Sequence, residues 1–172
     1  MELKIGFEDD TMASQGSDGM RIQRPIDSPI EQRNTAKGNP NGILQYARPL
    51  SNRQSALLEQ VPTFDSRATV RKRDVNLRDL SALTAETGDE FALFTKGSER
   101  LVIRGDAVHV AVTQEAARQL AEQGYRWSGH THPGYNDFCL SPSDGDLAIL
   151  EVFHQKQSVI GNSKGVYLKF WR

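Results

Sequence analysis

Two histidines, His130 and His132, are separated by one residue in the stretch "WSGHTHPGYNDFCLSPSDGD". The residues around them predict a strand, on which positions i and i+2 point to the same side. Two imidazoles on one side of a strand can converge on one metal ion, and neutral imidazole is a common zinc ligand. Two histidines exposed on an edge strand would have the same spacing. The pair alone therefore leaves a zinc site and an ordinary strand both open.

Asp144 is the candidate for a third zinc ligand, because it lies at the start of a predicted helix that follows the histidines through one loop. Asp146 and Asp137 are the alternatives. Three protein ligands leave a fourth position open for water, which is typical of catalytic zinc. The order Ser141, Pro142, Asp144 is also what a helix start prefers, with Ser141 as the N-cap. The two interpretations are compatible, since a helix N-terminus also fixes the position of a ligand.

A hydrolytic zinc site also needs a general base near the attacking water. Glu90 is the candidate, because it precedes apolar strand residues and a buried carboxylate there needs a partner. An exposed glutamate at a strand end is the alternative. Glu86, Asp89 and Glu99 are weaker candidates, since they lie in a helix end or a turn. The Ser141 hydroxyl is the candidate donor to the oxyanion that forms when water attacks a carbonyl.

Cys139 is the only cysteine of the chain, which excludes an intramolecular disulfide and a zinc site built from cysteines alone. It could be a nucleophile, but a lone cysteine between Phe138 and Leu140 is more typical of apolar packing. The remaining histidines, His109 and His154, are expected to be structural.

The chain has 172 residues and a net charge of -1, which fits one domain or a domain with an appendage. A charge so near neutrality gives no indication of a polyanionic partner, and the basic residues 71–73 are more typical of a solvated turn than of a nucleic-acid site. No apolar run is long enough for a membrane span, and the acidic N-terminus has no hydrophobic signal core. We therefore expect a soluble chain, cytoplasmic or delivered as part of a larger secreted bacterial protein.

The two parts of the chain differ in composition. Residues 1–49 are rich in Gly, Pro, Ser, Asn, Asp and Gln and predict a flexible or extended arm, with a short strand near 3–7, before a domain over 50–172. Within the domain, caps and periodicity predict a mixture of helices and strands in which three strands follow one another, and hence an α+β fold with a small mixed sheet flanked by helices. The predicted helices lie at 51–61, 76–87 and 113–123 and from 141 onward, and the strands at 90–94, 100–105, 107–112, 125–132 and, as a pair, within 158–171.

The motifs "HTHP" and "SPSD", with Glu90 before them, resemble the signature of the JAMM (JAB/MPN-type) metalloproteases. The resemblance covers about 75–172 in element order and is sharpest over 127–147. It departs from the family pattern in two ways: the segment between His132 and Ser141 is one residue longer, and the strand after Glu90 lacks a glycine. The resemblance implies that His130, His132 and Asp144 bind Zn²⁺, that Glu90 is the general base and that Ser141 assists the oxyanion.

This resemblance implies the MPN/JAB (cytidine-deaminase-like) fold and hydrolysis of peptide or isopeptide bonds, with a protein or peptide substrate and ubiquitin-like proteins among the expected ones. The arrangement of a low-complexity arm before a short domain is similar to the JAB-type C-terminal domains of bacterial polymorphic toxins, and this likeness would imply a cognate immunity protein. The alternative is a non-catalytic MPN-like binding module or scaffold. We expect neither nucleic acid nor a membrane as a partner.

Overall fold

The computed structural model describes residues 4–5, 46–110 and 112–172. The predicted arm over 1–49 therefore lies largely outside the described residues. Within it, β1 (Lys4–Ile5) pairs antiparallel with β5 (Val112–Thr113), at the place where a short strand is expected. Among the described residues, none of the helices combines the length and the apolar character needed to cross a membrane.

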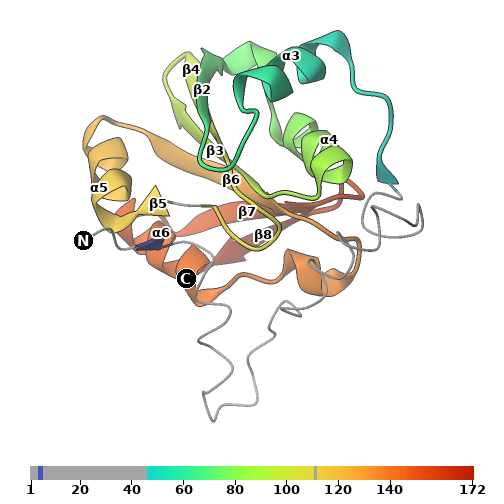
Figure 1. Ribbon diagram of the computed structural model, residues 1–172. Helices are drawn as coiled ribbons and strands as arrows, with labels where there is room; N and C mark the ends of the chain where they lie inside the picture. Colours follow the sequence, from blue (N-terminus) through green and yellow to red (C-terminus); the bar gives the residue numbers. More distant parts are fainter. Residues whose placement is uncertain (1–3, 6–45, 111) are drawn as a thin grey trace.

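The centre of the domain is a six-stranded mixed sheet in the order β2-β4-β3-β6-β7-β8 (Figure 1). Neighbouring strands are antiparallel except β6 and β7, which run parallel. Parallel neighbours need a crossover connection, and a loop with helix α6 supplies it here. The strands are β2 (Arg67–Arg71), β3 (Phe91–Lys96), β4 (Glu99–Arg104), β6 (Arg126–His132), β7 (Gln157–Asn162) and β8 (Tyr167–Trp171).

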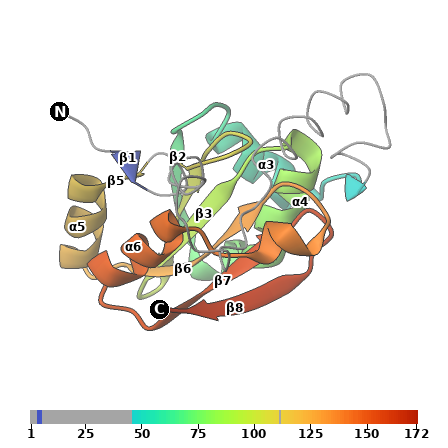
Figure 2. The same ribbon diagram turned by 90° about the horizontal axis from the view of Figure 1, so that it is seen from below.

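Helices cover both faces of this sheet, so the predicted α+β fold with a small mixed sheet flanked by helices is confirmed (Figures 1 and 2). One pair of helices lies on one face and the second pair on the other. The first pair is α3 (Asn52–Gln60) and α4 (Leu77–Thr87), and the second is α5 (Gln114–Glu122) and α6 (Asp144–Val152).

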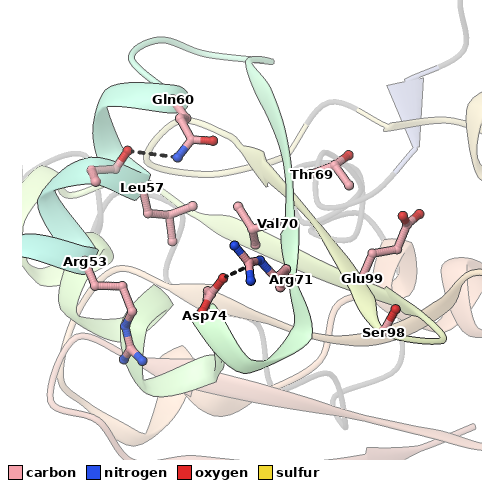
Figure 3. A pocket seen from close by; sticks show the side chains of 10 residues that line it. Arg53, Leu57, Gln60, Thr69, Val70, Arg71, Asp74, Ser98 and Glu99 are labelled. Carbon is pink, nitrogen blue, oxygen red and sulfur yellow. Dashed lines mark hydrogen bonds and ion pairs between the residues drawn. The ribbon is translucent and has the colours of Figure 1, made fainter.

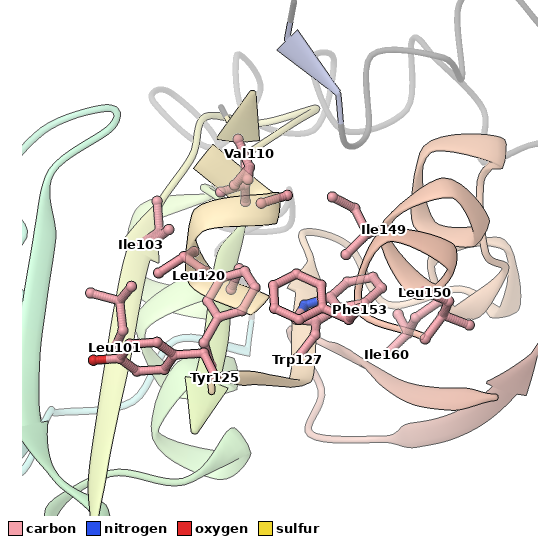
Figure 4. Close-up of a cluster of buried hydrophobic side chains, with 14 of the residues drawn as sticks. Leu101, Ile103, Val110, Leu120, Tyr125, Trp127, Ile149, Leu150, Phe153 and Ile160 are labelled. Atoms are coloured by element: carbon pink, nitrogen blue, oxygen red, sulfur yellow. The ribbon is translucent and has the colours of Figure 1, made fainter. Parts of the chain in front are cut away.

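Each face of the sheet carries its own apolar core, because successive residues of a strand point to opposite sides. On β3, Phe91 and Leu93 pack toward α3 and α4, while Ala92 and Phe94 belong to the core beneath α5 and α6. Figure 4 shows the second core, in which Trp127 of β6 lies among side chains from α5, α6 and β7. The face that holds Ala92 is therefore also the face on which α6 lies.

Helix ends follow the local sequence closely. Ser51 and Asn76 cap α3 and α4, and each forms a reciprocal capping box with the residue three positions later. Gly88 ends α4 with a φ of 75°, in the left-handed region that favours glycine. These predicted helix ends are confirmed because a cap depends on only a few neighbouring residues.

Two predictions of secondary structure are wrong, and one strand is missed. The expected strand over 107–112 is not formed at 107–110, because the Asp106 carboxylate accepts the backbone N–H groups of Val108 and His109 and closes a turn. The polar edge strand β2 was not predicted at all. The last helix begins at Asp144 with Ser143 as its N-cap, whereas the sequence predicts Ser141 there.

Candidate metal centre

Strand β6 lies between β3 and β7 and carries both histidines of the motif. His130 is opposite Ala92 on β3, and the small alanine leaves room for the imidazole on the α6 face. Thr131 points the other way, where its hydroxyl lies 2.6 Å from that of Thr84 on α4. The alternation expected of a strand thus places His130 and His132 on one side, beneath the start of α6.

A β-bulge immediately precedes the histidines. The register between β3 and β6 shifts where Leu93 pairs with Gly129 and Phe94 with Trp127. Gly129 has a φ of 151°, and a Cβ added to it would lie 2.8 Å from the carbonyl oxygen of Val159 on β7. Glycine is therefore required at this bulge, which sets the orientation of the next residue, His130.

We expect Gly129→Ala to destabilise the fold by about 2 kcal/mol or more, because it combines strained backbone with a clash against backbone. Chemical denaturation measures the effect. Gly97→Ala is the matched control: Gly97 also has positive φ, 55°, but a Cβ there meets nothing within 4 Å. Equal losses in the two variants would contradict the role assigned to the packing at Gly129.

Asp146 completes the cluster from helix α6. Its Oδ2 accepts the backbone N–H of Ser143 at 2.7 Å, and Ser143 Oγ accepts the N–H of Asp146 at 3.1 Å. This capping box fixes the carboxylate so that its other oxygen, Oδ1, lies 3.1 Å from His130 Nε2. The group that caps the helix is thus also held against the histidine.

The three side chains offer one ligand atom each within 4.8 Å of one another, and all three are buried. His130 Nε2 lies 2.9 Å from His132 Nε2. Ligands around a tetrahedral zinc ion, with bonds of about 2.0–2.1 Å, are separated by about 3.3 Å. Two separations in the cluster, 2.9 Å between the histidines and 3.1 Å from His130 to Asp146, are therefore near that of a zinc site.

The hydrogen bonding around His132 fixes which ring nitrogen faces the cluster. Its Nδ1 lies 2.9 Å from the carbonyl oxygen of Cys139, which can only accept, so Nδ1 carries the proton and donates. In the neutral ring, Nε2 is then a bare acceptor directed at His130 and Asp146. Asp146 Oδ1 is buried and completes no hydrogen bond of ordinary geometry with the described residues. His132 Nε2 and Asp146 Oδ1 are both acceptors beside His130 Nε2, so a proton on that nitrogen or a metal ion among these atoms would stabilise the arrangement.

Neighbouring rings and loops hold the histidines in place. The Trp127 ring stacks on His130 at 5.0 Å between centroids and 20° between planes. Cys139 is buried, and its Sγ lies 3.3 Å from the carbonyl oxygen of Pro133. The thiol of Cys139 is thus a buried hydrogen-bond donor, and its backbone carbonyl contacts His132.

Glu90 lies next to this cluster, one residue before β3. Continuing the pairing of Phe91 with Thr131 brings Glu90 opposite His132, and Glu90 Oε1 is 3.9 Å from His132 Nε2. The side chain is 0 % exposed, so the alternative of an exposed strand-end glutamate is wrong. A carboxylate beside a candidate ligand is in position to exchange protons with a group bound there.

The other candidates for the base have partners elsewhere or face solvent. The Asp89 carboxylate accepts two hydrogen bonds from Arg104, at 2.7 and 3.0 Å. Glu99 accepts a hydrogen bond from the Tyr125 hydroxyl, and Glu86 is exposed. Among the four carboxylates, Glu90 is the one that the structure brings beside the histidines.

The structure does not bring every predicted residue to the cluster. Asp144, the predicted third ligand, is exposed at the first position of α6, and Asp137 is exposed as well. Ser141 is half-buried, and its N–H donates to Phe138 at the end of the 3-10 helix η4 (Asp137–Leu140). Asp146, which the sequence offered as an alternative, is the aspartate that lies beside the two histidines.

A signal for Asp146 is present in the sequence. Positions 146, 149, 150 and 153 follow the spacing i, i+3, i+4, i+7 of one helix face, and all four are buried. Asp144 is about 200° away from Asp146 around the same helix. The apolar residues Ile149, Leu150 and Phe153 thus indicate which aspartate faces the sheet. The spacing Ser-x-x-Asp occurs twice, at Ser141–Asp144 and at Ser143–Asp146. In the second occurrence, the serine caps α6 and the aspartate belongs to the cluster.

The cluster is closed: His130, His132, Asp146 and Glu90 are each 0 % exposed. A separate surface pocket of about 560 Å³ lies beside α3, β2 and the β3–β4 turn (Figure 3). Arg71, which is paired with Asp74, is among the charged residues that line this pocket. None of the cluster residues lines the pocket. The two sites are therefore distinct.

The chain was compared with protein-family models, with curated proteins and with solved structures, and none of the three comparisons found a match.

Proposed function

We propose that this chain is a zinc-dependent hydrolase of peptide or isopeptide bonds. The observation that carries the proposal is the convergence of His130, His132 and Asp146 beside the buried carboxylate of Glu90. Two imidazoles and one carboxylate are a ligand set typical of catalytic zinc, and three protein ligands leave one coordination position open. A buried acid beside the ligands is what hydrolysis would require and what a purely structural site does not need.

The donor set fits zinc in chemistry and in spacing. His132 is oriented by the Cys139 carbonyl, and Asp146 by its capping box, so both ligands are held by a second layer of contacts. When bound, zinc supplies a Lewis acid and lowers the pKa of a water molecule to near neutrality.

The residues of the chain would carry the proton transfers. Glu90 takes the proton from the attacking water and later gives it to the leaving amine, which couples both steps to one carboxylate. The hydroxyl of Ser143, which lies in the capping box of Asp146, would donate to the oxyanion of the tetrahedral intermediate. Burial of the cluster strengthens each of these interactions because the surroundings have a low dielectric constant.

The substrate proposed is a protein or peptide chain, with ubiquitin-like conjugates among the candidates. Tyr135 and Phe138, in the loop after His132, are 39 % and 49 % exposed. Exposed aromatic side chains next to a candidate centre are suited to contact an extended chain. If the chain belongs to a bacterial toxin, an immunity protein would be its further partner.

A non-catalytic binding module is the second candidate, and one observation favours it. The cluster and Glu90 are fully buried, so a substrate would need the covering segments to move before it reached them. A module of this kind would keep the metal as a structural element and show no turnover.

Removal and return of the metal tests the proposal. Elemental mass spectrometry of the purified chain is expected to find about one equivalent of zinc. The chain is also expected to cleave at least one member of a panel of peptides and ubiquitin-like conjugates. Dialysis against a chelator should abolish the cleavage, and zinc should restore it. Magnesium is the control, and it should not restore cleavage because it requires octahedral oxygen ligation.

The outcomes separate the two candidates. Stoichiometric zinc without cleavage of any substrate would favour the binding module. A chain that holds no metal after purification in zinc-supplemented medium would contradict both.

A further inference from the structure

A second pocket, of about 320 Å³, lies between α4, the β7–β8 turn and the segment around Tyr46. Among the described residues, three cationic side chains and no acidic one line it. These are Arg48, Arg78 and Lys164. The like charges of Arg78 and Lys164 beside one small cavity repel each other, and an anion between them would relieve the repulsion.

Two hydroxyl groups of the pocket, those of Ser81 and Tyr167, lie near each other, and neither completes a hydrogen bond of ordinary geometry with the described residues. Ser81 is 3 % exposed, and Ser81 Oγ and Tyr167 Oη are both buried and unsatisfied. Burial raises the pKa of the Tyr167 hydroxyl, the nearby Ser81 hydroxyl and Arg78 oppose the rise, and the Asp79 carboxylate adds to it. Both groups are therefore neutral O–H donors at neutral pH. Leaving such donors without an acceptor costs free energy, which a ligand oxygen in the pocket would recover.

The pocket is held in shape before any ligand binds. The Asn162 side chain accepts the backbone N–H groups of Lys164 and Val166, each at 3.0 Å, and so fixes the β7–β8 turn. Lys164 Nζ lies 5.8 Å from the centre of the Tyr46 ring, within range of a cation–π contact. Because this cationic turn is already ordered, little conformational entropy is lost when an anion binds to it.

We propose that this pocket binds an anionic oxygen group, a carboxylate or a phosphate. The ligand oxygens would accept hydrogen bonds from Ser81 and Tyr167 and would pair with the cations at the rim. Guanidinium and ammonium groups bind carboxylates and phosphates alike. A hydroxyl group that donates a hydrogen bond to the ligand fixes its orientation in addition to the charge attraction. The inference does not depend on hydrolysis, since a chain without turnover would bind the same anion.

Titration of the full-length chain with inorganic phosphate, and separately with acetate, tests the proposal. Amide chemical shifts would be followed by nuclear magnetic resonance at ionic strength held constant with chloride. We expect saturable shifts at Arg78–Ala82 and Ser163–Gly165. Lys164→Gln and Ser81→Ala should each weaken binding at least about fivefold, the loss expected for one charge-assisted hydrogen bond. Saturation by phosphate alone or by acetate alone would support the site and identify its ligand class.

Lys169→Gln is the matched control, because Lys169 is also an exposed lysine on the β7–β8 hairpin but does not line the pocket. It should leave the binding of both anions unchanged. Three results would overturn the proposal: no saturation by either anion, an equal loss in the Lys164 and Lys169 variants, or shifts centred on residues 71–73.

Discussion

Glu90→Gln is expected to lower kcat for hydrolysis by about 100-fold to 10,000-fold while zinc content stays unchanged. Glutamine has the same shape as glutamate but cannot take a proton from water, so the loss isolates proton transfer from positioning. Glu90 is fully buried and lies 3.9 Å from His132 Nε2, which places the changed group beside the candidate centre. Steady-state kinetics on the best substrate of the panel, with zinc measured on the same sample, provides the result.

Glu86→Gln is the control for this substitution. It makes the same chemical change four residues earlier, on an exposed side chain, and should leave kcat as in the wild type. Chemical denaturation of both variants would verify that they fold. Full activity in Glu90→Gln, with zinc retained, would exclude Glu90 as the general base and leave the metal cluster intact as a proposal.

Asp146→Asn is expected to weaken zinc binding by at least about 100-fold, whereas Asp144→Asn should leave it unchanged. Loss of a second-layer partner alone typically costs 10–100-fold in metal affinity, and loss of a charged ligand costs more. The asparagine retains an oxygen that accepts the N–H of Ser143, so the start of α6 should persist. Competition with a chelator of known affinity measures the difference.

The Asp144 variant is the matched control, because it removes the same charge from the first turn of the same helix. Its effect should be limited to the interaction with the helix dipole, about 0.3–1 kcal/mol in stability. The opposite result, with zinc lost in Asp144→Asn only, would mean that α6 begins two residues earlier in the zinc-bound protein. The third ligand would then be the one that the sequence first indicated.

Local sequence was sufficient for most of the helix ends and for the geometry of the histidine pair. Ser51, Asn76 and Thr113 each cap a helix where they were expected, since capping depends on residues within one turn. The i, i+2 spacing of His130 and His132 places both rings on one side of β6 because side chains alternate along any strand. Neither result depends on what packs against these segments.

Pairing across the sheet was harder to predict. β2 has exposed residues at Arg67, Thr69 and Arg71 and forms because its backbone pairs with β4, not because its own sequence is strongly apolar. The segment after Asp106 shows the reverse case: its alternating pattern is typical of a strand, but the carboxylate of Asp106 binds the local backbone first. A pattern alone does not show which competitor for the backbone N–H groups prevails.

The sequence by itself determined the α+β composition, the caps, the paired histidines and a set of carboxylates that could join them. Only the tertiary structure decided which of these carboxylates lie beside the histidines. Two overlapping Ser-x-x-Asp segments are equivalent as helix starts, and the burial of Ile149 and Leu150 against the sheet selects the phase that turns Asp146 toward His130. Glu90 reaches His132 only through the register of β3 on β6, a contact between residues far apart in the chain that local spacing cannot specify.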